Sequence, residues 1–149
     1  MRFTFEVPGK PVPQGSMRSF GRGRMVHSNA QDLLPWRAHV AAHAMSECPK
    51  DWDPTGPMAV ELAFDMVRPR SHWSRNGNGP LKPSAPWWDA KRPDTDKLAR
   101  AVLDALTDAG IWGDDSQVVQ LTAEKRYDDD GPGHLTCTIT RLTERRGTE

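Results

Sequence analysis

The chain has 149 residues and a mass of 16.7 kDa, a length typical of one domain. It carries 20 lysines and arginines against 20 aspartates and glutamates, and its mean hydropathy is −0.70. No run approaches the roughly 20 apolar residues of a membrane-spanning helix, the strand-like start does not resemble a signal peptide, and two widely spaced cysteines do not suggest a disulfide framework. We therefore expect a single cytoplasmic domain over residues 1–149, with no membrane partner.

The first element is expected to be a strand followed by a long loop. Phe3, Phe5 and Val7 alternate with polar residues, which predicts a half-buried strand over residues 2–7. Residues 8–29 are rich in proline and glycine and carry four cations and no acid. Loops of this length in compact domains are usually functional or disordered, so this one is a candidate for binding a polyanion.

A helix and a second strand should follow this loop. The helix is either capped by Ser28 or Asn29, or starts near Leu34, because proline at position 35 is favoured in a first turn. It should end near residue 47. Its apolar residues fall on one face: Leu33, Trp36, Val40 and Ala44. Strict alternation then predicts a strand over residues 58–67, followed by a second long loop over residues 68–92.

The C-terminal half is expected to contain one amphipathic helix and two more strands. Apolar residues from Leu98 to Ala109 cover one face of a helix, and Gly110 provides its stop. The third strand would bury Val119, Leu121 and Ala123, and the fourth would bury Leu135, Cys137 and Ile139. The predicted fold class is α+β, a two-layer β-α-β-α-β-β domain whose small mixed sheet is covered by two helices.

Acidic residues gather at both ends of the second helix. Asp94 and Asp96 lie in its extended start, where alternate side chains point the same way, and Asp114 and Asp115 lie beyond its far end. If the connection after Gly110 leads back along the helix, these carboxylates can meet and hold Mg²⁺. The alternative is structural, because acids at a helix start complement its dipole and Asp-Asp after glycine is common in turns.

At this point the sequence resembles the RusA-type Holliday junction resolvases, DNA endonucleases of phages and prophages. The resemblance rests on residues 93–98 (Pro-Asp-Thr-Asp-Lys-Leu), on the Asp-Ala-Leu of residues 104–106, and on residues 113–118 (Gly-Asp-Asp-Ser-Gln-Val). It implies that Asp94, Asp96 and Asp115 bind the metal.

The resemblance also implies an activity. The chain would be a homodimer that resolves four-way junctions and related branched DNA by paired phosphodiester hydrolysis, in recombination and repair, within the cytoplasm of a bacterial host. The cofactor would be Mg²⁺, with Mn²⁺ as the alternative, and Asp114 would support the metal site. Two rival interpretations are a non-catalytic, structure-selective DNA-binding protein and a nuclease that cuts flaps or forks.

Two basic residues depart from the family's motif. Lys97 stands where the family usually has asparagine, and Arg100 stands where it has a functional lysine. Arginine keeps the positive charge but cannot transfer a proton, so Arg100 is expected to stabilise charge only. Lys125 matches a lysine that the family tends to carry in the third strand, and it breaks the apolar alternation there, which favours a catalytic role over a strand-end lysine.

Cations outside the motif are expected to contact the DNA backbone in a salt-sensitive way. These candidates are Lys10, Arg18, Arg22, Arg24, Arg68, Arg70, Arg75 and Lys97. Phe20 is a candidate wedge that could enter a base step.

Three other features carry weaker signals. His39 and His43 have the spacing of helical zinc ligands but lack the glutamate of a metalloprotease motif. Residues 128–130 (Asp-Asp-Asp) are expected to form a turn and not a calcium loop. Trp87 and Trp88 either stack on DNA bases or anchor the second loop, with the anchoring role favoured.

Overall fold

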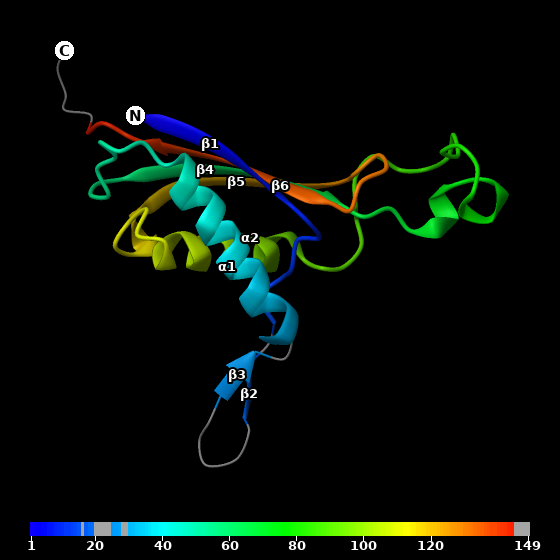
Figure 1. Cartoon of the computed structure of the whole chain (residues 1–149), viewed down its shortest axis with the longest axis horizontal. Coiled ribbons are helices and arrows are strands. Elements are labelled where there is room, and N and C mark those ends of the chain that lie inside the picture. The colour runs from blue at the N-terminus through cyan, green and yellow to red at the C-terminus, as the bar shows by residue number, and fades with distance from the viewer. Residues whose placement is uncertain (16, 20–24, 28–29, 145–149) are drawn as a thin grey trace.

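The computed structural model describes residues 1–15, 17–19, 25–27 and 30–144, with only the backbone described at 17–19, 25–27 and 30 (Figure 1). Its main layer is a four-stranded sheet that two helices cover on one face, so the predicted α+β class is confirmed. None of the described helices is long and apolar enough to cross a membrane.

The sheet is mixed, as expected. It consists of β1 (Arg2–Pro8), β4 (Met58–Met66), β5 (Val118–Tyr127) and β6 (His134–Arg141), in the order β1-β6-β4-β5. The β4–β5 pair is parallel and the other pairs are antiparallel. A parallel pair needs a crossover connection, and the helix between these two strands provides it.

The first helix, α1, spans Ala30–Glu47 and contains Pro35. It starts before Leu34, so the later of the two expected starts is wrong, and the expected end near residue 47 is confirmed. The four residues expected to face inward are all buried: Leu33, Trp36, Val40 and Ala44.

The second helix, α2, spans Thr95–Asp108 and buries the expected apolar face. Gly110 follows with a φ of +76°, a conformation that glycine adopts readily and that ends the helix. Arg37 of α1 pairs with Asp108 of α2 at 2.6 Å, which ties the two helices together beneath the sheet.

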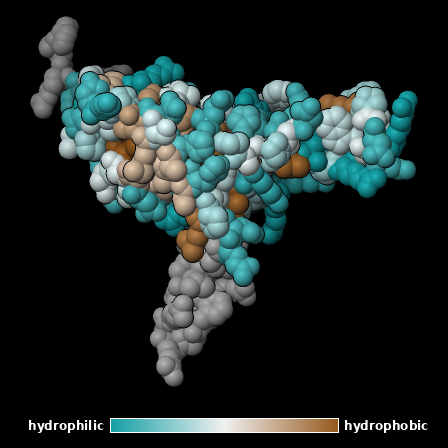
Figure 2. Space-filling view, in the orientation of Figure 1, coloured by the Kyte–Doolittle hydropathy of each residue, from teal (hydrophilic) through white to brown (hydrophobic). Residues whose placement is uncertain are grey.

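Both long loops carry more structure than the sequence predicted. Within residues 8–29 a hairpin forms from β2 (Met17–Ser19) and β3 (Met25–His27), and Figure 1 shows it projecting from the helical layer. Residues 68–86, which we call the arm, project from the end of the sheet and contain the short 3₁₀ turns η1 (Arg70–His72) and η2 (Arg75–Gly77). Figure 2 colours most of the arm as hydrophilic.

The expected burial of the third strand is wrong in its first half. Leu121 pairs with buried Val60 and faces the helical side, yet it is 47% exposed, and Val119 is 59% exposed. Because β5 is the edge strand, the helical layer does not reach this part of it. Two apolar side chains are therefore left uncovered along one edge of the sheet.

Candidate metal and DNA-binding site

The first acid pair, Asp94 and Asp96, lies at the start of α2. Asp94 occupies the N-cap position in an extended conformation (φ −71°, ψ 139°), but its side chain makes no capping hydrogen bond with the described residues. An N-cap aspartate normally accepts a hydrogen bond from the helix backbone. Both carboxylates are exposed, and Asp94 is available to a ligand in place of the helix.

Lys125, which breaks the apolar pattern of β5, contacts the segment that leads into this pair. Its half-buried ammonium donates hydrogen bonds to the carbonyls of Lys91 and Pro93, immediately before Asp94. The lysine thus joins β5 to the chain that enters α2. Arg100, one turn beyond Asp96 on α2, is exposed.

The second acid pair, Asp114 and Asp115, lies beyond the other end of α2, at η3 (Asp115–Gln117). Asp114 caps η3, and the side chain of Gln117 accepts from the N–H of Asp114 at 3.1 Å to complete a capping box. Hydrogen bonds from the hydroxyl and N–H of Ser116 lower the pKa of the Asp114 carboxyl. Asp115 is exposed.

The two acid pairs do not meet within one chain. The 14 residues of α2 span about 21 Å, and the connection after Gly110 does not lead back along the helix. Trp112 is buried and donates to the hydroxyl of Thr107 at 2.8 Å, while Trp52 donates to the carbonyl of Ile111 at 2.9 Å, so the connection is held at the far end. The described residues accordingly contain no group of three His, Cys, Asp or Glu side chains able to hold a metal.

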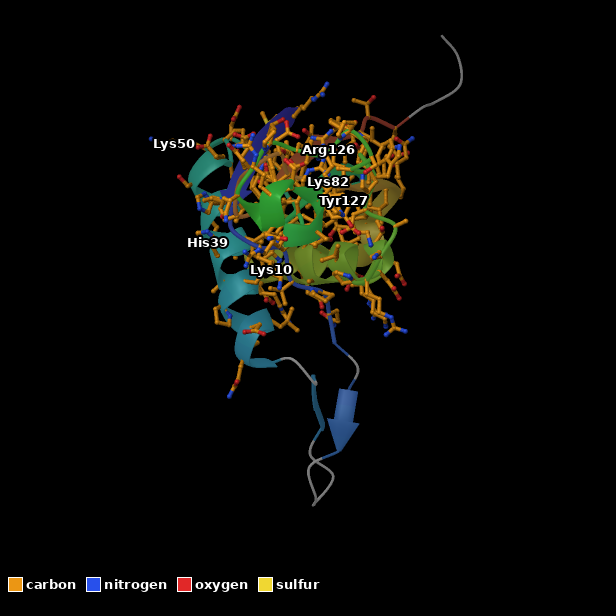
Figure 3. All side chains as sticks on the ribbon, turned by 90° about the vertical axis from the view of Figure 1, so that its right-hand side faces the viewer. Lys10, His39, Lys50, Lys82, Arg126 and Tyr127 are labelled. Carbon is orange, nitrogen blue, oxygen red and sulfur yellow. The ribbon has the colours of Figure 1, made fainter. Side chains whose placement is uncertain are left out.

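A cleft of about 1040 Å³ opens beside the first acid pair. The segment 8–15 forms one wall, α1 contributes Trp36 and His39, and Asp94 and Lys97 line the α2 side. Figure 3 labels Lys10 and His39 on two of its walls. Lys10 and Lys97 are both exposed, so the structure brings these two predicted DNA contacts close to Asp94.

The structure describes the side chains of only some of the remaining predicted DNA contacts. Arg70 and Arg75 are exposed on the arm, and the side chain of Arg70 donates to the carbonyl of Asn76. The backbone of Arg18 lies in β2, and its side chain is outside the described atoms. Arg22, Arg24 and Phe20 lie outside the described residues.

Arg68 corrects the expectation of an exposed DNA contact, because it is only 8% exposed. Its guanidinium donates to the carbonyl of Pro86 at 2.7 Å and lies 5.1 Å from the centre of the Tyr127 ring. It therefore anchors the base of the arm to β5. The sequence does not distinguish this arginine from Arg70, since both lie in the same proline-rich segment.

Sequence reasoning missed a buried polar cluster around Arg68. Asp89 is 7% exposed, and its contact with Tyr127, together with burial as the larger cause, raises the pKa of the tyrosine. Burial, and next the charge of Arg68, lower the pKa of His72, whose ring stands edge-on to Tyr127 at 4.7 Å. The one available signal was that Tyr127 is the only tyrosine in the chain.

The expectation that Trp87 and Trp88 anchor the second loop holds only for their backbone. The carbonyl of Trp87 accepts from the N–H of Tyr127 at 3.0 Å, and Trp88 bridges to Arg126. The two side chains are 54% and 57% exposed, so their rings do not provide the anchor.

Two minor expectations agree with the contacts observed. Asp128 accepts a hydrogen bond from the N–H of Gly133 at 3.1 Å, as a turn residue does. His39 lies 3.0 Å from the carbonyl of Pro8 and its ring stands edge-on to His43, which is a structural arrangement.

Comparison with known proteins identifies relatives along nearly the whole chain. The family model "Endodeoxyribonuclease RusA" matches residues 8–140. The "Uncharacterized protein YqaN" of Bacillus subtilis (strain 168) is 29% identical over 132 residues, which cover 85% of this chain and 88% of that protein.

Relatives with a named activity match over a shorter stretch. The "Crossover junction endodeoxyribonuclease RusA" of Escherichia coli (strain K12) is 46% identical over 54 residues, which cover 36% of this chain and 44% of that protein. The protein of the same name from Enterobacteria phage 82 matches with the same identity and coverage.

Proposed function

The chain belongs to the RusA family of endodeoxyribonucleases, and on that premise we propose that it is a metal-dependent endonuclease that cuts four-way junctions and related branched DNA. The observation that carries the proposal is the first acid pair, exposed and free of capping beside Lys125, Lys97 and a cleft. Such a nuclease would act on recombining and damaged DNA in a bacterial cytoplasm.

Within one chain the expected metal ligands are divided between the two ends of α2, so neither end has all three. Asp94 and Asp96 are hard oxygen donors of the kind that Mg²⁺ prefers, and Mn²⁺ accepts them too. Asp115 lies beyond the far end of this helix, which is about 21 Å long. We infer that a complete site takes Asp94 and Asp96 from one chain and Asp115, supported by Asp114, from a second copy.

The uncovered edge of β5 is suited to bring that second copy into position. Among the described residues, β5 has no strand partner over residues 118–124 on the side away from β4. Leu121 lies at the middle of this edge. Antiparallel pairing of two such edges about a two-fold axis near Leu121 covers the exposed apolar side chains of both copies and directs Asp115 of one toward Lys125 of the other.

The chain's own residues would then divide the work of hydrolysis. The three carboxylates would hold the metal, which when bound would supply charge stabilisation for the transition state and activation of a water. Arg100 would add positive charge at the reacting phosphate, without transferring a proton. Lys125 fixes the segment before Asp94 and contributes charge there. Lys10 and Lys97 bind neighbouring phosphates along the cleft.

Mixing two inactive variants tests the shared site. Asp96→Asn and Asp115→Asn should each abolish Mg²⁺-dependent cleavage of a synthetic four-way junction. A dimer with one chain of each kind regains one intact site, so an equal mixture after subunit exchange should recover about a quarter of the wild-type sites and yield nicked products. If each site lay within one chain, mixing would restore nothing.

The wild-type protein provides the remaining controls. Cleavage should disappear in EDTA, and comparison of junctions with flaps and forks identifies the preferred branched substrate. Binding of junctions without any cleavage in Mg²⁺ or Mn²⁺ would contradict the proposal and favour a non-catalytic, structure-selective DNA-binding protein.

A further inference from the structure

Trp87 and Trp88 present an exposed aromatic pair at the end of the sheet. Their side chains are 54% and 57% exposed, and their rings stand edge-to-face with centroids 6.5 Å apart. Trp36 and Trp112, in contrast, are 5% and 1% exposed. Adjacent exposed tryptophans form apolar surface that is more often found at binding sites than on inert surface.

The backbone holds this pair rigidly against the outer edge of β5. The Trp87 carbonyl accepts from the N–H of Tyr127 at 3.0 Å, and the N–H of Asp89 donates to the carbonyl of Lys125 at 3.2 Å. Lys125 in turn contacts the carbonyls just before Asp94. The backbone of the pair is therefore fixed to β5 at Lys125, whose side chain contacts the segment that leads into the first acid pair.

Basic residues lie on both sides of the pair. The guanidinium of Arg126 lies 6.0 Å from the Trp87 ring and forms ion pairs with Asp65 at 2.7 Å and with Glu124 at 3.3 Å. Lys91 and Arg92 are exposed just after the pair, whereas the acid between, Asp89, is buried. Figure 3 shows Arg126 and Tyr127 at this end of the molecule. Aromatic faces among cations fit a ligand that has both a planar ring and an anionic group.

We propose that Trp87 and Trp88 form a stacking platform for an unstacked nucleobase at the branch point of the DNA. The inference rests on the proposed function, because a branch point offers bases that have lost a stacking neighbour, next to the phosphate to be cut. A second copy of the chain is the less suitable occupant. The β5 edge available to it ends before residue 125, and two copies of this cationic segment would repel each other.

Photochemical crosslinking tests the platform directly. 5-Iodo-2′-deoxyuridine, which crosslinks to aromatic side chains on irradiation, is substituted at each branch-point position of a junction bound by wild-type protein in EDTA. The crosslinked peptide should contain Trp87 and Trp88, and a fully paired duplex of the same sequence should not give this product. Crosslinks that map only to other peptides would overturn the platform. Because no cleavage is needed, this result is independent of whether the nuclease proposal holds.

Substitutions measure what the stacking contributes. Trp87→Leu and Trp88→Leu should each weaken junction binding roughly ten-fold while leaving duplex binding unchanged, and Trp88→Phe should recover part of the loss. Met45→Ala, at an exposed apolar residue of α1, is the matched control and should change neither. An unchanged ratio of junction to duplex affinity would overturn the proposal. So would conversion of either leucine variant to a monomer in light scattering, since the rings would then be covered by a second copy.

Discussion

At the start of α2, Asp94 occupies the capping position without capping, whereas beyond its end Asp114 caps η3 and Gln117 completes a capping box. Gln117 also donates to the carbonyls of Pro54 and Gly56, both at 2.9 Å, so the second acid pair is fixed to the neighbouring turn. The first acid pair instead faces a cleft and a basic segment. Under the proposed function, the end of the helix beside the cleft would receive DNA, and the fixed end would be presented to a second copy.

The largest effect is expected when the second copy is prevented from binding, because the two ends of α2 then cannot form one site. Leu121→Arg puts two like charges at the centre of the proposed edge pairing, so the chain should become a 16.7 kDa monomer and lose at least about 100-fold in junction cleavage. Light scattering and cleavage assays on the same sample check both results. Leu34→Arg, at an exposed position on α1, should leave both unchanged. A Leu121→Arg variant that stays dimeric and active would reject the edge pairing.

The next largest effect concerns the anchor of the arm near the first acid pair. Arg68→Met removes a buried guanidinium and leaves the Pro86 carbonyl without its donor, so the free energy of unfolding should fall by about 2 kcal/mol. Arg70→Met, at an exposed residue of the same arm, should change it by less than about 0.5 kcal/mol. Urea denaturation measures both. Equal losses in the two variants would contradict the distinction between anchor and surface.

The salt dependence of junction binding tests whether the cations of the arm contact DNA phosphates. Replacing Arg70, Arg75 and Lys82 with alanine should reduce the slope of log K against log salt by up to about 0.9 for each phosphate that the variant no longer neutralises. Lys50→Ala, at an exposed lysine after α1, serves as the control. Should the slope keep its wild-type value in the arm variants, those cations do not contact phosphate.

The smallest expected effect is a pH dependence of the arm's attachment. Burial, followed by the charge of Arg68, lowers the pKa of His72 in the folded chain. The unfolded chain therefore binds its proton more readily, so the stabilising contribution is complete above about pH 6.5 and is lost as the pH falls through the lowered value. The protection factors of the backbone amides of residues 68–92, which compare the measured exchange with the intrinsic rate at each pH, should fall on acidification, and His72→Gln should flatten this response. Identical profiles in the two proteins would exclude His72 as the cause.

The sequence predicted the elements better than their exposure. In α1 and α2 the apolar residues repeat with the helical period, so they fall on one face of each helix. The structure confirms that this face is buried in both helices. The alternation in β5 correctly indicated which residues point to the helical side of the sheet. The lateral position of α2 decides which of these residues are covered, so the predicted burial of Leu121 is wrong. No local pattern encodes where a helix sits across a sheet.

The sequence named candidates for the site, but it did not predict how they are arranged. Asp94 and Lys125 lie together as the family motif and the broken apolar pattern suggested. The separation of Asp115 follows from Trp112, whose burial directs the chain away from the helix start, and this packing cannot be read from the Asp-Asp motif. Arg68 differs from Arg70 through its contacts with the Pro86 carbonyl and with Tyr127, a residue far along the chain.

The position of β6 has a consequence for synthesis of the protein. This strand is the last of the described elements to leave the ribosome, yet it lies between β1 and β4 and pairs with both. Until it emerges, β1 has no neighbour in the sheet, and the inward residues Leu135, Cys137 and Ile139 are missing from the core. Contacts so distant in sequence form slowly. The four-stranded sheet should therefore form only after β6 has left the ribosome, and a nascent chain without β6 should lack a complete core.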